Sequence, residues 1–143
     1  MIFRSLSELD ADYLDSAKNT DFADGWNKDM VLSAISGGRF FGFIAQENNV
    51  PVAFITYSIS YDDADIESVY VNAQNRKKGI AKELISLVEK NVASLGKQKL
   101  FLEVKENNLP AINLYLSAGF NKISIRKKYY ADGSNAIVMQ KEL

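Results

Sequence analysis

A short apolar strand, a basic turn that contains glycine and a long amphipathic helix together constrain this chain more than any other feature. The strand ends at Val69-Tyr70-Val71, the turn reads Arg76-Lys77-Lys78-Gly79, and the helix begins at Ile80. Apolar residues then recur at helical spacing as far as Val92, and Gly96 closes the helix. The first backbone N–H groups of such a helix lack partners, and with the helix dipole they favour a phosphate or pyrophosphate.

The rest of the pattern predicts one mixed α/β domain over residues 1–143, with its elements in the order β-α-α-β-β-β-α-β-α-β-β. Helices are expected from Ser7, Asn27, Ile80 and Leu109, because apolar residues follow each position at helical spacing. A hairpin turn is expected at Glu47-Asn48-Asn49. The expected strands are Ile2–Leu6, Phe40–Gln46, Pro51–Tyr61, Ile66–Val71, Leu100–Val104, Phe120–Arg126 and Ala136–Gln140.

Two missing residue types restrict the chemistry. The chain has no cysteine, which excludes disulfides and thiolate chemistry, and no histidine, the commonest metal ligand and general base. We therefore expect no metal, and catalysis by carboxylates, tyrosine, lysine, hydroxyls or backbone groups. No apolar run approaches the ~20 residues of a membrane span, and the first residues lack the layout of a signal peptide. We expect a cytoplasmic monomer or weak dimer, without membrane or direct nucleic-acid partners.

The charges are divided unequally along the chain. Residues 1–68 hold four basic and twelve acidic side chains, whereas residues 69–143 hold thirteen basic and six acidic ones. An acidic run, Asp62-Asp63-Asp65-Glu67, ends the first part. Such a division arises by drift of composition, or because one part faces a cationic partner and the other an anionic one. The run itself is typical of a solvated loop, and it would also suit a cationic substrate.

Several segments downstream of the basic turn help to interpret it. By itself it matches neither Gly-x-x-x-x-Gly-Lys-Ser/Thr nor Gly-x-Gly-x-x-Gly, and a basic helix start is also typical of a solvated turn. Together with the segments 102–108, 111–115 and 119–120, which read Leu-Glu-Val-Lys-Glu-Asn-Asn, Ala-Ile-Asn-Leu-Tyr and Gly-Phe, the sequence resembles the GNAT superfamily of N-acetyltransferases. These enzymes bind acetyl-CoA at an Arg/Gln-x-x-Gly-x-Gly/Ala turn. The segments 125–130 and 136–139, and Trp26 more loosely, resemble the RimI-type enzymes, which acetylate the N-terminal amine of a ribosomal protein.

Carried over residue by residue, the resemblance implies that acetyl-CoA is the acetyl donor. Val69 and Val71 would offer backbone groups to its acetyl and pantetheine portions, and Asn108 would also contact it. Glu103 would be the general base and Tyr115 the general acid. The pyrophosphate would be held by the turn and the start of the helix, namely Arg76, Lys77, Lys78, Gly79, Ile80, Ala81 and Lys82.

These residue types suit direct transfer of an acetyl group to an amine. An amine attacks a thioester only as the free base, and because a peptide α-amine has a pKa of about 8, a carboxylate is needed to take its proton. A phenol can return a proton to the leaving thiolate, and a backbone N–H can hold the oxyanion. Other interpretations stay open: Glu103 can be a solvent-facing strand residue, and Tyr115 a core tyrosine. Asp65 and Glu67 are rival bases.

The acceptor is less well defined than the donor. Tyr70 stands where the family has a small residue, and Glu67 with Ser68 stands where RimI-type strands often read Leu-Asn. Tyr129 and Tyr130 either line an acceptor groove or pack on the final hairpin. We expect the acceptor to be a protein N-terminus, specifically that of a ribosomal protein, with a small amine or a lysine side chain as the alternative. The alternative class is a non-catalytic regulatory domain that binds acyl-CoA.

Overall fold

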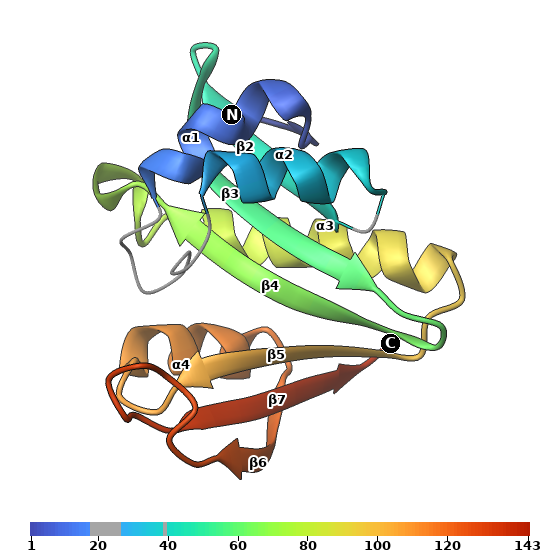
Figure 1. Cartoon of the computed structure of the whole chain (residues 1–143), viewed down its shortest axis with the longest axis vertical. Coiled ribbons are helices and arrows are strands. Elements are labelled where there is room, and N and C mark those ends of the chain that lie inside the picture. Colours follow the sequence, from blue (N-terminus) through green and yellow to red (C-terminus); the bar gives the residue numbers. More distant parts are fainter. Residues whose placement is uncertain (18–26, 39) are drawn as a thin grey trace.

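One seven-stranded sheet forms the centre of the computed structural model, which describes residues 1–17, 27–38 and 40–143 (Figure 1). The strands lie in the order β1-β2-β3-β4-β5-β7-β6, and neighbours are antiparallel except for β4 and β5, which are parallel. Their bounds are β1 (Ile2–Ser5), β2 (Phe40–Glu47), β3 (Val50–Ile59), β4 (Asp63–Val71), β5 (Lys99–Lys105), β6 (Asn121–Arg126) and β7 (Ala136–Glu142).

Helices cover both faces of the sheet. Ile44 and Phe54 pack against α1 and α2 on one face, whereas their strand neighbours Ala45 and Ile55 belong to the larger core shared with α3 and α4. This division follows from the alternation of side chains along a strand. The helices are α1 (Ala11–Ser16), α2 (Lys28–Ser36), α3 (Ile80–Ser94) and α4 (Leu109–Ser117), with short 3-10 turns η1 (Glu8–Asp10) and η2 (Ala73–Asn75). Of the described helices, none is long and apolar enough to cross a membrane.

The predicted order of elements is confirmed. Of three local predictions, one is confirmed and two are wrong. Asn27 caps α2 as expected, because its Oδ1 accepts a hydrogen bond from the Met30 N–H at 2.9 Å. The acidic run is not a loop as expected, because β4 already begins at Asp63 and pairs on both sides. Leu9 does not share the buried face of the first helix, because it lies in the 3-10 turn, where the helical phase differs, and is 94% exposed. Trp26 lies outside the described residues.

The parallel strands β4 and β5 separate along their length. They pair only at Asp63–Lys99, Ala64–Leu100 and Asp65–Phe101, although both strands continue well beyond these positions. Figure 1 shows the two strands diverging toward their carboxyl ends. The facing backbone groups of the remaining residues are therefore free to meet something other than a neighbouring strand. We call this gap the β4–β5 opening.

A bulge in β4 lies beside the β4–β5 opening. In the pairing with β3, Thr56 faces Ser68 and Tyr57 faces Ile66, so Glu67 is an extra residue without an opposite partner. A bulge of this kind bends the strand and changes the direction of the side chains that follow. Glu67 is consequently exposed, whereas Ser68 and Val69 are both buried.

Candidate active site

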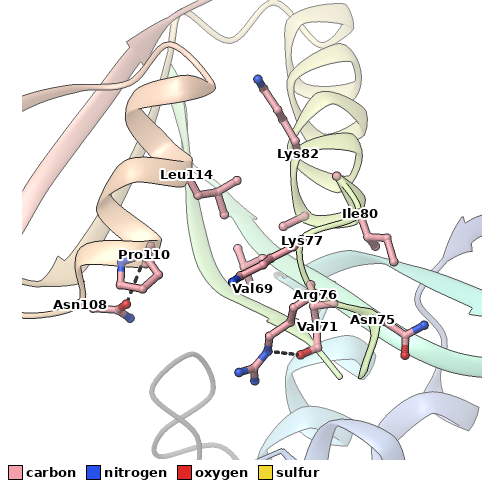
Figure 2. A pocket seen from close by; sticks show the side chains of 13 residues that line it. Val69, Val71, Asn75, Arg76, Lys77, Ile80, Lys82, Asn108, Pro110 and Leu114 are labelled. Atoms are coloured by element: carbon pink, nitrogen blue, oxygen red, sulfur yellow. Dashed lines mark hydrogen bonds between the residues drawn. The ribbon is translucent and has the colours of Figure 1, made fainter. Parts of the chain in front are cut away.

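A cavity of about 530 Å³ lies where the N-terminus of α3 faces α4 across the end of β4. Figure 2 shows Asn108, Pro110 and Leu114 on one side, Lys77 and Lys82 on the other, and the two valines of β4 between them. We call it the helix-end cavity. It is lined by Val69, Val71, Asn75, Arg76, Lys77, Gly79, Ile80, Ala81, Lys82, Asn108, Pro110, Ala111 and Leu114.

Free backbone donors face the helix-end cavity at the start of α3. The first bond within the helix runs from the Glu83 N–H to the Gly79 carbonyl at 3.1 Å. The N–H groups of Ile80, Ala81 and Lys82 therefore have no acceptor within α3. With the positive end of the helix dipole, these donors favour an anion such as a pyrophosphate.

The turn before α3 is wound tightly by two left-handed residues, Lys77 with φ of 63° and Gly79 with φ of 79°. Glycine adopts this conformation without strain, whereas it is uncommon for lysine. Lys77 and Lys82 both line the helix-end cavity, so the turn adds positive charge to the free N–H groups. Lys78 is exposed, and it is not among the lining residues with which the sequence grouped it.

Two side chains hold the walls of the helix-end cavity in place. The Arg76 Nε donates to the Val71 carbonyl at 2.9 Å, which ties the turn to the end of β4. Asn108 caps α4, because its Oδ1 accepts a hydrogen bond from the Ala111 N–H at 3.2 Å. The amide NH₂ of Asn108 remains available to donate into the cavity.

The backbone of β4 presents polar groups to the β4–β5 opening. The Asn72 N–H donates to Val52 on the β3 side at 2.8 Å. Consecutive residues in a strand direct their N–H and C=O groups to opposite edges, so Val69 and Val71 direct theirs toward the opening. The Val71 carbonyl is used by Arg76, as described above. The Val69 N–H therefore faces the place where the helix-end cavity meets the opening.

A second cavity, of about 840 Å³, lies beside the same opening. We call it the carboxylate cavity, because three of its lining side chains are acidic and one, Arg126, is basic. Its walls come from β4, β5, β7 and the end of β6 with the turn that follows. It is lined by Asp65, Ile66, Glu67, Phe101, Leu102, Glu103, Arg126, Tyr129, Tyr130, Ala131 and Val138.

Glu103 lies on β5, between β4 and β7, with its side chain 27% exposed into the carboxylate cavity. Its Oε1 is 3.2 Å from the Arg126 Nε. The rival bases Asp65 and Glu67 line the same cavity. Burial, and next the charges of Glu67, Glu103 and Asp63, raise the pKa of Asp65. The geometry therefore brings all three candidate bases together without choosing among them.

Tyr115 lies on α4, on the helix face that carries Ala111 and Leu114 of the helix-end cavity. Its ring is buried in the main core and packs edge-to-face against Phe120 at 6.0 Å. The phenol lies near Tyr130 of the carboxylate cavity, and burial followed by this neighbour raises the pKa of Tyr115. A phenol with a raised pKa keeps its proton and can donate it.

Sequence reasoning located most of the lining residues and missed a few. Apart from Lys78, the turn borders one cavity together with the two β4 valines and Asn108, and Glu103 borders the other. Asn75, Pro110, Ala111 and Leu114 were missed, because nothing in their residue types indicates a binding role. The sequence indicated Arg126 only as one residue of the segment 125–130 that resembles the RimI-type enzymes. Its contact with Glu103 depends on strands that are far apart in the sequence. Among the described residues, no group of acidic side chains is arranged to hold a metal ion.

A helix N-terminus beside two separating parallel strands can hold the phosphates of a donor, and the nearby carboxylates can bind an amine. The arrangement suits the class of enzyme that moves an acyl group from a phosphate-bearing donor to an amine. The family model described as the acetyltransferase (GNAT) family matches residues 4–120. The chain therefore belongs to this family of acetyl-CoA-dependent N-acetyltransferases.

The chain is similar to enzymes that act on protein N-termini. Over 118 residues the chain is 33% identical to the [ribosomal protein bS18]-alanine N-acetyltransferase of Haemophilus ducreyi, which covers 80% of this chain and 81% of the relative. Over 114 residues it is 32% identical to an N-alpha-acetyltransferase of Saccharolobus solfataricus, and the match covers 71% of this chain and 68% of the relative. The crystal structure of the ribosomal-protein-S18-alanine N-acetyltransferase from Escherichia coli superimposes with a TM-score of 0.86 and 27% identity, and 99% of this chain and 92% of that chain are covered.

Proposed function

We propose that this enzyme acetylates the N-terminal α-amine of a protein, most specifically that of a ribosomal protein. The observation that carries the proposal is that both cavities border β4 where it separates from β5: Val69 and Val71 line the helix-end cavity, and Asp65 and Glu67 line the carboxylate cavity. A donor with phosphates fits the first cavity, and an amine fits the second. The names of the two relatives described above support an α-amine rather than a lysine side chain.

We propose that the donor lies with its phosphates at the free N–H groups of Ile80, Ala81 and Lys82. Lys77 and Lys82 add charge, and Asn108 donates from the α4 side. The acetyl end then lies in the β4–β5 opening, where the Val69 N–H can hold the carbonyl oxygen as negative charge develops on it. This arrangement uses only groups that line the cavity or face the opening.

For the chemical step we propose Glu103 as the general base and Tyr115 as the general acid. Glu103 takes a proton from the acceptor ammonium, directly or through water, and the free amine attacks the thioester carbon. A carbon–nitrogen bond forms, the carbon–sulfur bond breaks, and Tyr115 gives a proton to the leaving sulfur. The attacking nitrogen loses its second proton as the amide forms, and this proton returns Tyr115 to the phenol, directly or through water. Glu103 releases the first proton to solvent. No covalent bond to the enzyme is needed, which agrees with a chain that lacks cysteine and histidine.

The charges of the carboxylate cavity support a cationic acceptor. Asp65, Glu67 and Glu103 face a single guanidinium, that of Arg126. An ammonium group, or a basic peptide that carries one, would reduce the repulsion among these carboxylates. The basic residues of the turn face the donor instead, so the unequal division of charge along the sequence would match two oppositely charged substrates.

The first test measures release of the free thiol from acetyl-CoA with a panel of acceptors. The panel contains basic peptides beginning with Ala, Ser or Met, N-terminally blocked peptides containing lysine, and polyamines. We expect turnover only with free N-termini and a preference for an initial alanine. Turnover confined to the lysine peptides or the polyamines would contradict the proposal, as would acetyl-CoA binding with no turnover at all.

Substitution of the three carboxylates identifies the base. Glu103→Gln should lower kcat by about 10²- to 10⁴-fold, because general base catalysis contributes on this order. It should leave the Kd for acetyl-CoA nearly unchanged, as measured by calorimetry. Asp65→Asn and Glu67→Gln are the matched controls, since both residues line the same cavity. If Glu103→Gln stays active and one of the controls does not, that control residue is the base.

A further inference from the structure

The carboxylate cavity contains one positive charge that the proposed chemistry does not use, the guanidinium of Arg126. Its Nε lies 3.2 Å from the Glu103 Oε1. The two residues are not on adjacent strands, since β7 lies between β5 and β6. Glu103 faces Val138, Val138 faces Ser124, and Arg126 is two residues farther along β6 on the same face of the sheet. Arg126 therefore reaches across β7 to the carboxylate.

The guanidinium is held between two partners rather than pointing freely into solvent. It lies over the Tyr129 ring, 5.4 Å from the ring centre, and its Nε also meets the Glu103 carboxylate. Tyr129 also lies close to Glu103, and the proximity of this carboxylate raises the pKa of Tyr129. Glu103 is thus contacted by two side chains from one short segment at the end of β6.

The fold does not require this ion pair. Arg126 is 57% exposed, and an ion pair this exposed contributes little to stability. All six residues of β6 are exposed at the edge of the sheet, so the strand is held mainly by its pairing with β7. Arg126 could instead extend into solvent with little loss of stability, as the exposed Lys122 on the same strand does.

The electrostatic need for Arg126 comes from the carboxylates around Glu103. Asp65 and Glu67 of β4 line the same cavity, and neither forms an ion pair with any residue that the structure describes. Lys105, on the same strand as Glu103, lies 3.6 Å from Asp132 and 5.2 Å from the centre of the Tyr130 ring. Without Arg126, the repulsion from Asp65 and Glu67 would turn the Glu103 carboxylate away from the opening.

We propose that Arg126 is a positioning residue that holds the Glu103 carboxylate in place and directed toward the β4–β5 opening. The role rests on the proposed function of Glu103 as the base. Arg126 acts through Glu103 and does not itself contact the reacting atoms. Because the pair is partly exposed, an incoming ammonium can approach Glu103 from the solvent side without first removing Arg126.

The test compares Arg126→Met, Arg126→Lys and Arg126→Ala, with Lys122→Met as a matched control on the same strand. The acceptor is a basic peptide beginning with alanine or, if the panel favours a lysine peptide or a polyamine, that acceptor. We expect Arg126→Met to lower kcat about tenfold, since hydrogen bonds to charged groups are the stronger ones, while the Kd for acetyl-CoA stays unchanged. Arg126→Lys should recover most of the loss, and added guanidinium ion should partly rescue Arg126→Ala.

A double-mutant cycle separates this role from the alternatives. In a Glu103→Gln background, Arg126→Met should cause no further fall, because the residue acts through Glu103. An equal fall in both backgrounds would mean that Arg126 contacts the acceptor itself and would overturn the proposal. An equal fall for Lys122→Met would point to damage of the edge strand and also overturn it. Unchanged kcat for Arg126→Met beside an inactive Glu103→Gln would refute only the role of Arg126, whereas an active Glu103→Gln would refute the base itself.

Discussion

At the residue scale, Tyr115 combines a buried position in the core with the catalytic role proposed above. It is buried in the core, yet its phenol oxygen makes no hydrogen bond to any residue that the structure describes. Tyr115→Phe therefore removes no internal hydrogen bond and should leave the thermal midpoint nearly unchanged. If the phenol is the general acid, kcat should fall about 10²-fold or more. Steady-state kinetics beside thermal unfolding checks both parts. An unchanged kcat would show that Tyr115 is a core residue only.

At the scale of the elements, β1 is fastened to the first helical turn through Asp10, which is 4% exposed. The Arg4 guanidinium donates to both carboxylate oxygens at 2.7 and 2.9 Å, and the Ser7 N–H donates at 2.9 Å. Burial favours the neutral acid, but these hydrogen bonds outweigh it and lower the pKa of Asp10. Asp10→Asn should therefore reduce the free energy of unfolding at pH 7 by about 2 kcal/mol.

The same ion pair predicts a pH dependence with a defined sign. A carboxyl group whose pKa is lowered by folding stabilises the protein fully above its ordinary value near 4. The contribution is lost as the pH falls below that value and through the pKa of the folded state. Denaturant unfolding at pH 7 and at pH 3 should thus show a smaller difference between the natural chain and Asp10→Asn at the lower pH. A difference that is equal at both values would argue against the ion pair as its source.

At the scale of the whole molecule, the two parts of the sheet, β1–β4 and β5–β7, are joined by a short stretch of strand pairing. β4 and β5 share only three residue pairs. The helix-end cavity is lined from both parts, by β4 and α3 on one side and by α4 on the other.

Acetyl-CoA at 100 times its Kd should add about 2.7 kcal/mol to the free energy of unfolding. A rise of about 10 °C in the thermal midpoint would correspond to this gain.

Charge reversal shows whether this stabilisation comes from the helix-end cavity. Lys77→Glu together with Lys82→Glu should reduce the rise in the midpoint, and higher salt should diminish the difference between this variant and the natural chain. Lys90→Glu, an exposed position on the same helix that does not line the cavity, is the control and should behave as the natural chain does. An undiminished rise in the double variant would contradict the assignment of the phosphates to this end of α3.

Local patterns in the sequence determined the order of the elements and the turn before α3. Helical spacing, caps such as Asn27 and the glycine at the start of α3 act over a few residues, so they can be recognised without knowing the fold. For the same reason the lining of the helix-end cavity was predicted largely from one continuous segment. Lys78 shows the limit of this reasoning, because a run of basic residues does not reveal which side chain faces the cavity.

The tertiary structure decided what depends on the pairing of distant strands. Three features follow from the register of the strands. They are the point where β4 and β5 stop pairing, the choice of side chains that the Glu67 bulge exposes, and the contact of Arg126 with Glu103 across β7. Register is set by the packing of the entire sheet rather than by any short segment. The sequence by itself therefore determined the class of chemistry and most of the residues that line the helix-end cavity. The arrangement of charges in the carboxylate cavity was decided only when the chain had folded.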